Sequence, residues 1–256
     1  MKLHTVAPLM LLFPLLLSGC GGTSGELRTD QPRAARTAAE ANADLGLGYL
    51  RQGNYSEALV KLKRALRQDP ELARAHHYIA ELYNRLEQDD LAEKHYQRAL
   101  HLDPNDSAAQ NNFGVFLCAR GRFADAEPHF QAAVANPLYN GRAGSYENAA
   151  QCALDAGEEE KAERYLSAAL KLNPRLPRSL YRMAELRYQQ GEYMGARAYL
   201  QRLEGVVRPS AEILWLGFRI EKMAGADLAA EEYARKLEQQ FPSFAPWRRY
   251  QSDGTL

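Results

Sequence analysis

LGLGYLRQGNYSEALVKLKRALRQDP, residues 45–70, is the stretch of sequence from which the fold can be predicted. Small residues recur in it at Ala58 and Ala65, with larger apolar residues between them. Small side chains at a helix crossing let two backbones approach closely, and larger apolar residues fill the space beside them. Pro70 cannot continue a helix, so it marks the end of the second of two helices. The pattern predicts a helical hairpin over about 39–72.

The same pattern recurs along the chain with a period of 34 residues. Pro70, Pro104 and Pro174 follow the similar segments LRQD, LHLD and LKLN. Self-similarity at such a period is typical of an array in which each repeat is one two-helix unit. The third unit is followed by a connection two residues longer than the period requires. The expected units span 39–72, 73–106, 107–140, 143–176, 177–209 and 210–243.

This spacing of small and large residues resembles the tetratricopeptide repeat, or TPR. It predicts an all-α, right-handed superhelix of about six helix-turn-helix repeats over residues 39–243. Turns between the two helices of a unit are expected at Gly53, Gly121, Gly157 and Gly191. The last two units are degenerate, as expected where a terminal unit must present a polar outer face. The sixth unit keeps the apolar and small residues Leu216, Gly217, Ala229 and Tyr233.

Composition and motifs argue against several functional classes. The 256 residues contain 32 Lys and Arg and 32 Asp and Glu, so no basic surface for nucleic acid is expected. The sequence contains no HExxH or CxxC motif and no glycine-rich loop that leads from a strand into a helix. We therefore expect no catalytic residue, no cofactor, no metal site and no small-molecule substrate.

The N-terminus is typical of an export signal. Residues 1–19 combine a basic start with an apolar run of about a dozen residues, which is too short to span a bilayer. The ending LSGC resembles the lipobox of bacterial lipoproteins, in which the peptide is cut before the cysteine and the cysteine is acylated. The resemblance implies lipidation at Cys20. The alternative is an ordinary signal peptide that happens to contain a cysteine. Gly21 is not Asp, so the inner-membrane retention signal of that class is missing.

Two terminal segments flank the expected repeats. Residues 20–38 are rich in small and polar residues at their start, and we interpret them as a flexible tether between a lipidated Cys20 and the repeats. Residues 244–256 are expected to form a C-terminal tail. Each buried methylene contributes about 0.8 kcal/mol, so acyl chains on Cys20 would anchor the protein in a membrane without a spanning helix.

If Cys20 carries the lipid, two thiols remain, Cys118 and Cys152. They lie 34 residues apart, in the first helices of the third and fourth units, and the two-residue insertion shifts their repeat positions by two. Two residues turn a helix by about 200°, so these positions on neighbouring helices can face each other. A disulfide between them is plausible on this geometry. The alternative is two separately buried thiols.

Stacked repeats leave a concave surface that can bind a partner. The first helices of the units are expected to line this groove, and exposed apolar positions on them could meet an apolar peptide face. The alternative is that helix packing or the tether buries some of them. The candidate groove residues are Leu47, Leu50, Arg51, His77, Glu81, Asn84, Asn111 and Val115.

Several segments resemble the PilF/PilW type IV pilus biogenesis lipoproteins. They are LGLGYLRQGNYSEAL (45–59), NNFGVFLCARGRF (111–123), NPLY (136–139) and LWLGFRIEKMAGADLAAEEYARKLEQQFPSF (214–244). The cysteine pair also looks like that of some members. The resemblance implies an outer-membrane, lipid-anchored pilotin that faces the periplasm. Such a pilotin binds the pilus secretin subunit and promotes its localisation and assembly into multimers.

A second class of function also fits a lipid-anchored repeat protein. In this alternative the chain is a periplasmic TPR scaffold for peptidoglycan enzymes or for outer-membrane barrel assembly. An enzymatic class has no supporting motif. The secretin as a partner rests on the family resemblance alone, since composition and spacing do not indicate it.

Overall fold

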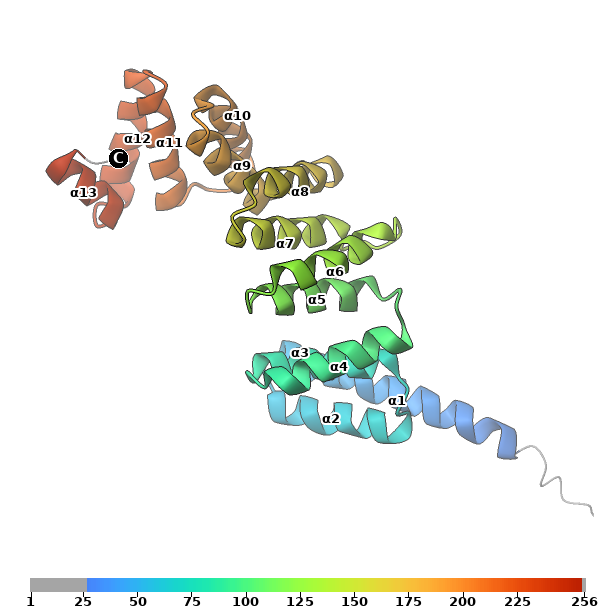
Figure 1. Ribbon diagram of the computed structural model, residues 1–256. Helices are drawn as coiled ribbons and strands as arrows, with labels where there is room; N and C mark the ends of the chain where they lie inside the picture. Colours follow the sequence, from blue (N-terminus) through green and yellow to red (C-terminus); the bar gives the residue numbers. More distant parts are fainter. Residues whose placement is uncertain (1–26, 255–256) are drawn as a thin grey trace, which may run out of the picture.

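A computed structural model describes residues 27–254, with side chains from residue 35 onward. This part of the chain forms α-helices joined by short turns, without a β-strand (Figure 1). In chain order the helices are α1 (Leu27–Arg51), α2 (Tyr55–Gln68), α3 (Ala73–Arg85), α4 (Asp89–Leu102), α5 (Ser107–Cys118), α6 (Phe123–Ala135), α7 (Arg142–Asp155), α8 (Glu159–Leu172), α9 (Pro177–Gln189), α10 (Tyr193–Glu204), α11 (Ala211–Met223), α12 (Asp227–Gln240) and α13 (Ala245–Asp253).

Helices α1 to α12 pair into six helical hairpins, so the all-α superhelix of about six repeats is confirmed. The hairpins from α1 to α8 stack on one another, and those from α9 onward turn away from this stack (Figure 1). Within each described hairpin the two helices are in extensive contact, and consecutive hairpins also touch. Each unit therefore buries its apolar faces against its own partner helix and its two neighbours.

The small residues lie at the helix crossings. Ala58 and Ala65 are fully buried. A Cβ atom at Gly46 would lie 2.6 Å from Cγ of Leu62, and one at Gly114 would lie 2.9 Å from the ring of Phe130. These approaches leave no room for a side chain, which explains why a glycine stands beside a large apolar residue in each of these units.

The turn between the helices of a unit adopts the left-handed conformation. The residue in this place has a φ of 72° to 78° at Gly53, Gly121, Gly157, Gly191 and Gly225. Glycine adopts this conformation without the steric cost that a Cβ brings. The second unit is the exception, because Glu87 occupies the same place with a φ of 57°.

The sixth unit corrects one expected position. The buried alanine at its helix crossing is Ala230, with 2% of its surface exposed, whereas Ala229 is only partly buried. Ala230 lies one 34-residue period after the buried Ala196, so α12 keeps the register of the unit before it. The expected residues Gly217 and Tyr233 do contact each other across the hairpin. The glycine makes room for the ring of Tyr233, 2.5 Å from where its Cβ would be.

The N-terminal expectation needs a correction within the described residues. Helix α1 begins at Leu27, so residues 27–38 are helical rather than part of a flexible tether. The good helix formers alanine and arginine are frequent here, and the buried Ala39 and Ala43 attach the helix to the first unit. Cys20 and the expected signal segment 1–19 lie outside the described residues.

The C-terminal segment is also different from the expected tail. Helix α13 packs Trp247, which is 5% exposed, against α11. The ring of Trp247 lies 5.4 Å from that of Phe218, and the ring of Tyr250 lies 4.8 Å from the same phenylalanine. The last hairpin of an array has no following unit to cover its apolar surface. Helix α13 covers it with aromatic side chains.

Candidate protein-binding surface

The first helices of neighbouring hairpins form a row, which we call the inner row. Helices α1, α3, α5 and α7 contact one another in sequence, and α9 contacts α11. The pair α7 and α9 is not among the helix pairs with extensive contact. The inner row is therefore in closer contact at α1–α3 and at α5–α7 than at α7–α9.

Two of the expected groove residues do not lie on an open surface. Leu50 is 5% exposed and belongs to the apolar core, because its side chain faces the next hairpin. His77 is 4% exposed. Its Nε2 accepts a hydrogen bond from Asn112 Nδ2 at 3.0 Å, and its Nδ1 lies 3.4 Å from Oδ2 of Asp106. The expectation that these residues line the groove is wrong, because both face neighbouring helices.

The other expected groove residues are at least partly accessible. Val115 is 39% exposed and Arg51 is exposed. Four more are half-buried, namely Leu47, Glu81, Asn84 and Asn111. The carboxylate of Glu81 pairs with Arg85 on its own helix, and Asn84 accepts a hydrogen bond from Arg120. These residues therefore help to hold the inner row together as well as lining it.

Side-chain hydrogen bonds connect four helices of the inner row, in what we call the polar ladder. It consists of His77, Asn112, Asn111, Asn148 and Arg178. Asn112 bonds to His77, Asn111 donates to Asn112 and Asn148 donates to Asn111, each at 3.0 Å. Arg178 donates to Asn148 at 3.0 Å. The ladder brings the expected residues His77 and Asn111 into one network, and it reaches across the α7–α9 junction.

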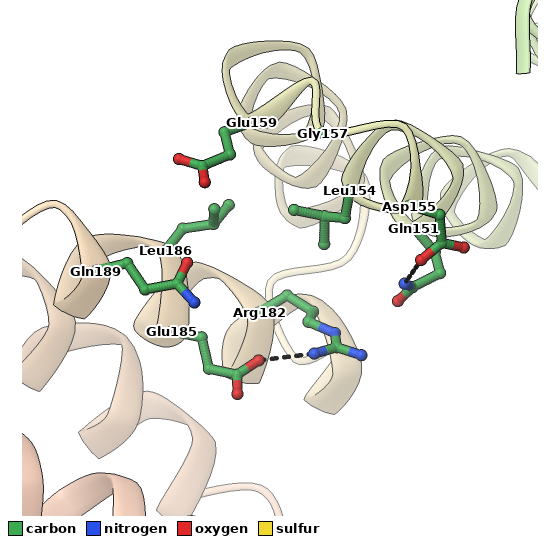
Figure 2. A pocket seen from close by; sticks show the side chains of 9 residues that line it. All are labelled: Gln151, Leu154, Asp155, Gly157, Glu159, Arg182, Glu185, Leu186 and Gln189. Atoms are coloured by element: carbon green, nitrogen blue, oxygen red, sulfur yellow. Dashed lines mark hydrogen bonds and ion pairs between the residues drawn. The ribbon is translucent and has the colours of Figure 1, made fainter. Parts of the chain in front are cut away.

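A cleft of about 370 Å³ lies in that junction, between the end of α7 and α9 (Figure 2). Leu154 and Leu186 stand on opposite sides of it. Its polar rim contains an ion pair at 2.7 Å between Arg182 and Glu185. The further lining residues are Gln151, Asp155, Gly157, Glu159 and Gln189. Sequence reasoning missed this cleft, because a gap between two units leaves no mark on either unit's repeat pattern.

Cys118 and Cys152 are joined by a disulfide in the structure, with their Cα atoms 5.7 Å apart. The bond links the end of α5 to α7, in the junction just before the cleft. Cys152 is 5% exposed, so the bond lies within the packed part of the inner row.

Two histidines of the second unit, the buried His76 and the half-buried His95, lie against each other. Nδ1 of His76 lies 2.9 Å from Nδ1 of His95, and Nε2 of His76 lies 3.0 Å from the carbonyl oxygen of Pro70. Burial, together with the charge of His76, lowers the pKa of His95 to about 4. Burial also lowers the pKa of His76. Both rings are therefore neutral at pH 7.

The described residues carry no other constellation that suggests metal or membrane chemistry. Between residues 27 and 254, three or more His, Cys, Asp or Glu side chains do not gather in a geometry that could hold a metal ion. Within the same range, no helix is both long enough and apolar enough to cross a bilayer.

An arginine framed by aromatic rings lies on the inner row beyond the cleft, and sequence reasoning missed it. Cζ of Arg219 is 4.8 Å from the ring centroid of Tyr188 and 5.7 Å from that of Trp215. We call these three residues, with the neighbouring Tyr181, the arginine–aromatic cluster. The four-residue spacing of Trp215 and Arg219 on one helix was the only signal in the sequence.

Comparison with known proteins identifies the class of the fold. Tetratricopeptide-repeat family models match residues 43–107 and 117–177, 153–213, and 95–127. The chain is thus a tetratricopeptide-repeat protein, in which stacked helical hairpins offer an extended surface to other proteins.

The relatives narrow this class. The chain is 31% identical to the type IV pilus assembly protein PilF of Pseudomonas aeruginosa over 249 residues, covering 96% of this chain and 98% of PilF. A solved structure of Pseudomonas aeruginosa PilF matches with a TM-score of 0.77 and 30% identity, over 86% of this chain and 99% of that one. PilW, described as a widely conserved type IV pilus biogenesis factor, matches with a TM-score of 0.71 and 29% identity, over 83% and 98%. The chain belongs to the PilF/PilW family.

Proposed function

We propose that this protein is an outer-membrane pilotin of the type IV pilus. In this role it binds the pilus secretin subunit from the periplasmic side and promotes its localisation and its assembly into multimers. The observation that carries the proposal is the alignment with PilF along nearly the whole chain, 96% of its length, on the same repeat fold. An inner row with accessible polar and aromatic side chains suits a protein partner.

Lipidation of Cys20 is the second part of the proposal. Its support is the sequence LSGC after an apolar run, with Gly21 rather than Asp behind the cysteine. Acyl chains on Cys20 would hold the protein in the outer membrane, since each buried methylene contributes about 0.8 kcal/mol. The protein acts by binding and positioning its partner, without a catalytic step.

Deletion of the gene tests the role in secretin assembly. We expect the deletion strain to lose heat-resistant secretin multimers on gels while secretin monomers and septation stay normal. Multimers at the wild-type level would contradict the proposal. A septation or barrel-protein defect with normal secretin would instead support a scaffold for peptidoglycan enzymes or barrel assembly.

Complementation tests the anchor separately. A Cys20→Ala variant is expected to fold normally but to be lost from the outer-membrane fraction after fractionation. Gly22→Ala is the matched control, because it changes a small residue next to the lipobox and leaves the cysteine in place. Retention of Cys20→Ala in the outer membrane would contradict lipidation at this residue.

A further inference from the structure

The guanidinium of Arg219 lacks a counter-charge within the described chain. Among residues 35–254 it makes no hydrogen bond or ion pair, and its Nε is buried without a partner. Its contacts are with the faces of two rings, those of Tyr188 and Trp215. A half-buried cation that is left unpaired is unusual, because removing such a group from water is costly unless a partner compensates it.

Three other arginines on the inner row have a carboxylate partner within the fold. Arg74 lies 3.7 Å from Asp44, and Arg178 lies 3.5 Å from Glu147. Arg182, on α9 like Tyr188, pairs with Glu185 at 2.7 Å. Each of these cations is compensated within the fold, whereas Arg219 is not.

Two carboxylates that follow Arg219 in the sequence, Glu221 on the same helix and Asp227 at the start of α12, are already engaged. Glu221 accepts hydrogen bonds from Arg197, one of them from Nε at 2.8 Å. Asp227 pairs with Lys222 at 2.9 Å. Neutralising Arg219 from within the chain would break one of these pairs. A carboxylate from another molecule could neutralise Arg219 without breaking either pair.

The surroundings of Arg219 have the composition of a binding hot spot. Tyrosine, tryptophan and arginine are the residue types that contribute most at protein interfaces, especially where they lie close together and exclude water. Tyr188 and Tyr181 are half-buried, so part of each ring remains accessible on the inner row. Burial raises the pKa of the Tyr181 phenol, the carboxylate of Glu185 raises it further, and the positive charge of Arg219 opposes this rise.

We propose that the arginine–aromatic cluster binds a segment of a partner protein through an Asp or Glu side chain. The carboxylate pairs with the guanidinium of Arg219, whose planar fork suits bidentate contact with two oxygens. The neighbouring residues of the segment pack on the accessible faces of Tyr181 and Tyr188. The inference deepens the proposed function, on which the identity of the partner rests, by giving the chemistry of the segment that is bound.

Peptide selection tests this chemistry without assuming any partner. Random dodecapeptides displayed on phage are selected against the full-length lipidated chain in detergent and, in parallel, against its Arg219→Gln variant. We expect Asp and Glu to be enriched at one position on the wild-type chain and not on the variant. Peptides without acidic enrichment, or the same enrichment on both proteins, would overturn the proposal.

The affinities of the selected peptide for variants of the chain then show whether its acidic residue contacts Arg219. Arg219→Gln is expected to weaken binding by about tenfold, and changing the peptide's acidic residue to its amide should do the same. The two changes together should cost little more than either alone, because they remove one and the same contact. Additive losses would overturn the assignment.

Two further variants exclude a general disturbance of the fold. Arg219→Lys keeps the charge but loses the planar fork, so it should recover part of the affinity. Arg182→Gln removes a paired arginine on the inner row and should leave the affinity within about twofold. Equal losses of peptide affinity in Arg219→Gln and Arg182→Gln would overturn the proposal. Sedimentation that shows a dimer of the wild-type chain, but only a monomer of Arg219→Gln, would also overturn it. Normal secretin multimers in the deletion strain would contradict the pilotin role and leave the peptide result unaffected.

Discussion

Two consecutive junctions of the inner row differ although they use the same repeat positions. Cys118 on α5 and Cys152 on α7 are joined by a disulfide. The equivalent positions of the next junction, one repeat further along the chain, hold Leu154 on α7 and Leu186 on α9. These two leucines stand on opposite sides of a cleft of about 370 Å³. One junction is joined by a covalent bond at these positions, and the other has a cleft between the equivalent side chains.

The difference shows that neighbouring junctions of one repeat array can be held together by different interactions. Each hairpin contacts only its neighbours, so stability is approximately a sum of unit and interface contributions. The α7–α9 junction is held by polar contacts at its other end, where Glu147 accepts hydrogen bonds from the backbone and side chain of Ser179 and lies 3.5 Å from Arg178. A covalent bond in one junction therefore need not tighten the next.

Loss of the disulfide should lower the stability of the protein more than any other change to the two junctions. Replacing Cys118 and Cys152 together by alanine is expected to lower the free energy of unfolding by about 3–4 kcal/mol, because a closed loop of this length restricts the unfolded chain. Urea unfolding with and without reductant measures the loss. Reductant should lower the wild-type midpoint and leave that of the double variant unchanged. A wild-type midpoint that is insensitive to reductant would show that the bond contributes nothing.

Truncation of the leucines probes the junction with the cleft. Leu186→Ala should cost about 2–3 kcal/mol, since Leu186 is 2% exposed and packs in the core. Leu154→Ala should cost about 1 kcal/mol or less, because a half-buried side chain beside a cleft loses fewer contacts. The matched control is Leu82→Ala, at the position of the second unit that corresponds to Leu186. Equal costs for Leu154 and Leu186 in urea unfolding would contradict a cleft at this junction.

Acid should lower the stability of the second unit, which lies away from both junctions. The pKa of His95 is lowered from 6.5 to about 4, so below pH 6.5 the unfolded chain takes up a proton that the folded chain refuses. Stability should therefore fall between pH 6.5 and 4 and stay level above this window. The loss should be on the order of 1 kcal/mol, because His95 is only half-buried and solvent screens its charge.

Urea unfolding across this pH range measures the acid effect. His95→Gln should reduce the pH dependence, and the lowered pKa of His76 should leave a smaller slope of the same sign. The double cysteine variant should show the same slope as the wild type, since distant sites contribute additively. A slope that changes when the disulfide is removed would mean that the second unit and the disulfide-linked junction are coupled.

Substitutions in the turns between paired helices should change the stability least. Glu87→Gly is expected to stabilise the protein by about 0.5–1 kcal/mol, because Glu87 adopts a left-handed conformation with a φ of 57°. Gly121→Ala, the same change in the opposite sense one unit later, should destabilise it by about 1 kcal/mol. Thermal unfolding of both variants measures these shifts. A loss of stability in Glu87→Gly would show that its side chain outweighs the backbone strain.

Much of the repeat array could be predicted because its determinants are local. Alanines such as Ala58, glycines such as Gly121 and prolines such as Pro70 each follow from the geometry of one hairpin. The facing of Cys118 and Cys152 could also be anticipated, since it needs only helix periodicity and the length of one connection. Leu50 could not be placed in this way, because its exposure depends on how the next hairpin is rotated.

Six helical hairpins and their order follow from the amino-acid sequence, because each hairpin is specified by contacts between residues close in the chain. Which side chains of the inner row face a neighbour and which face outward depends instead on how the hairpins pack against one another. The packing between neighbouring units buries His77, leaves a cleft beside Leu186 and holds Arg219 against two rings without an ion-pair partner. This packing depends on how each hairpin sits on the next one, which the repeat pattern within a unit does not encode.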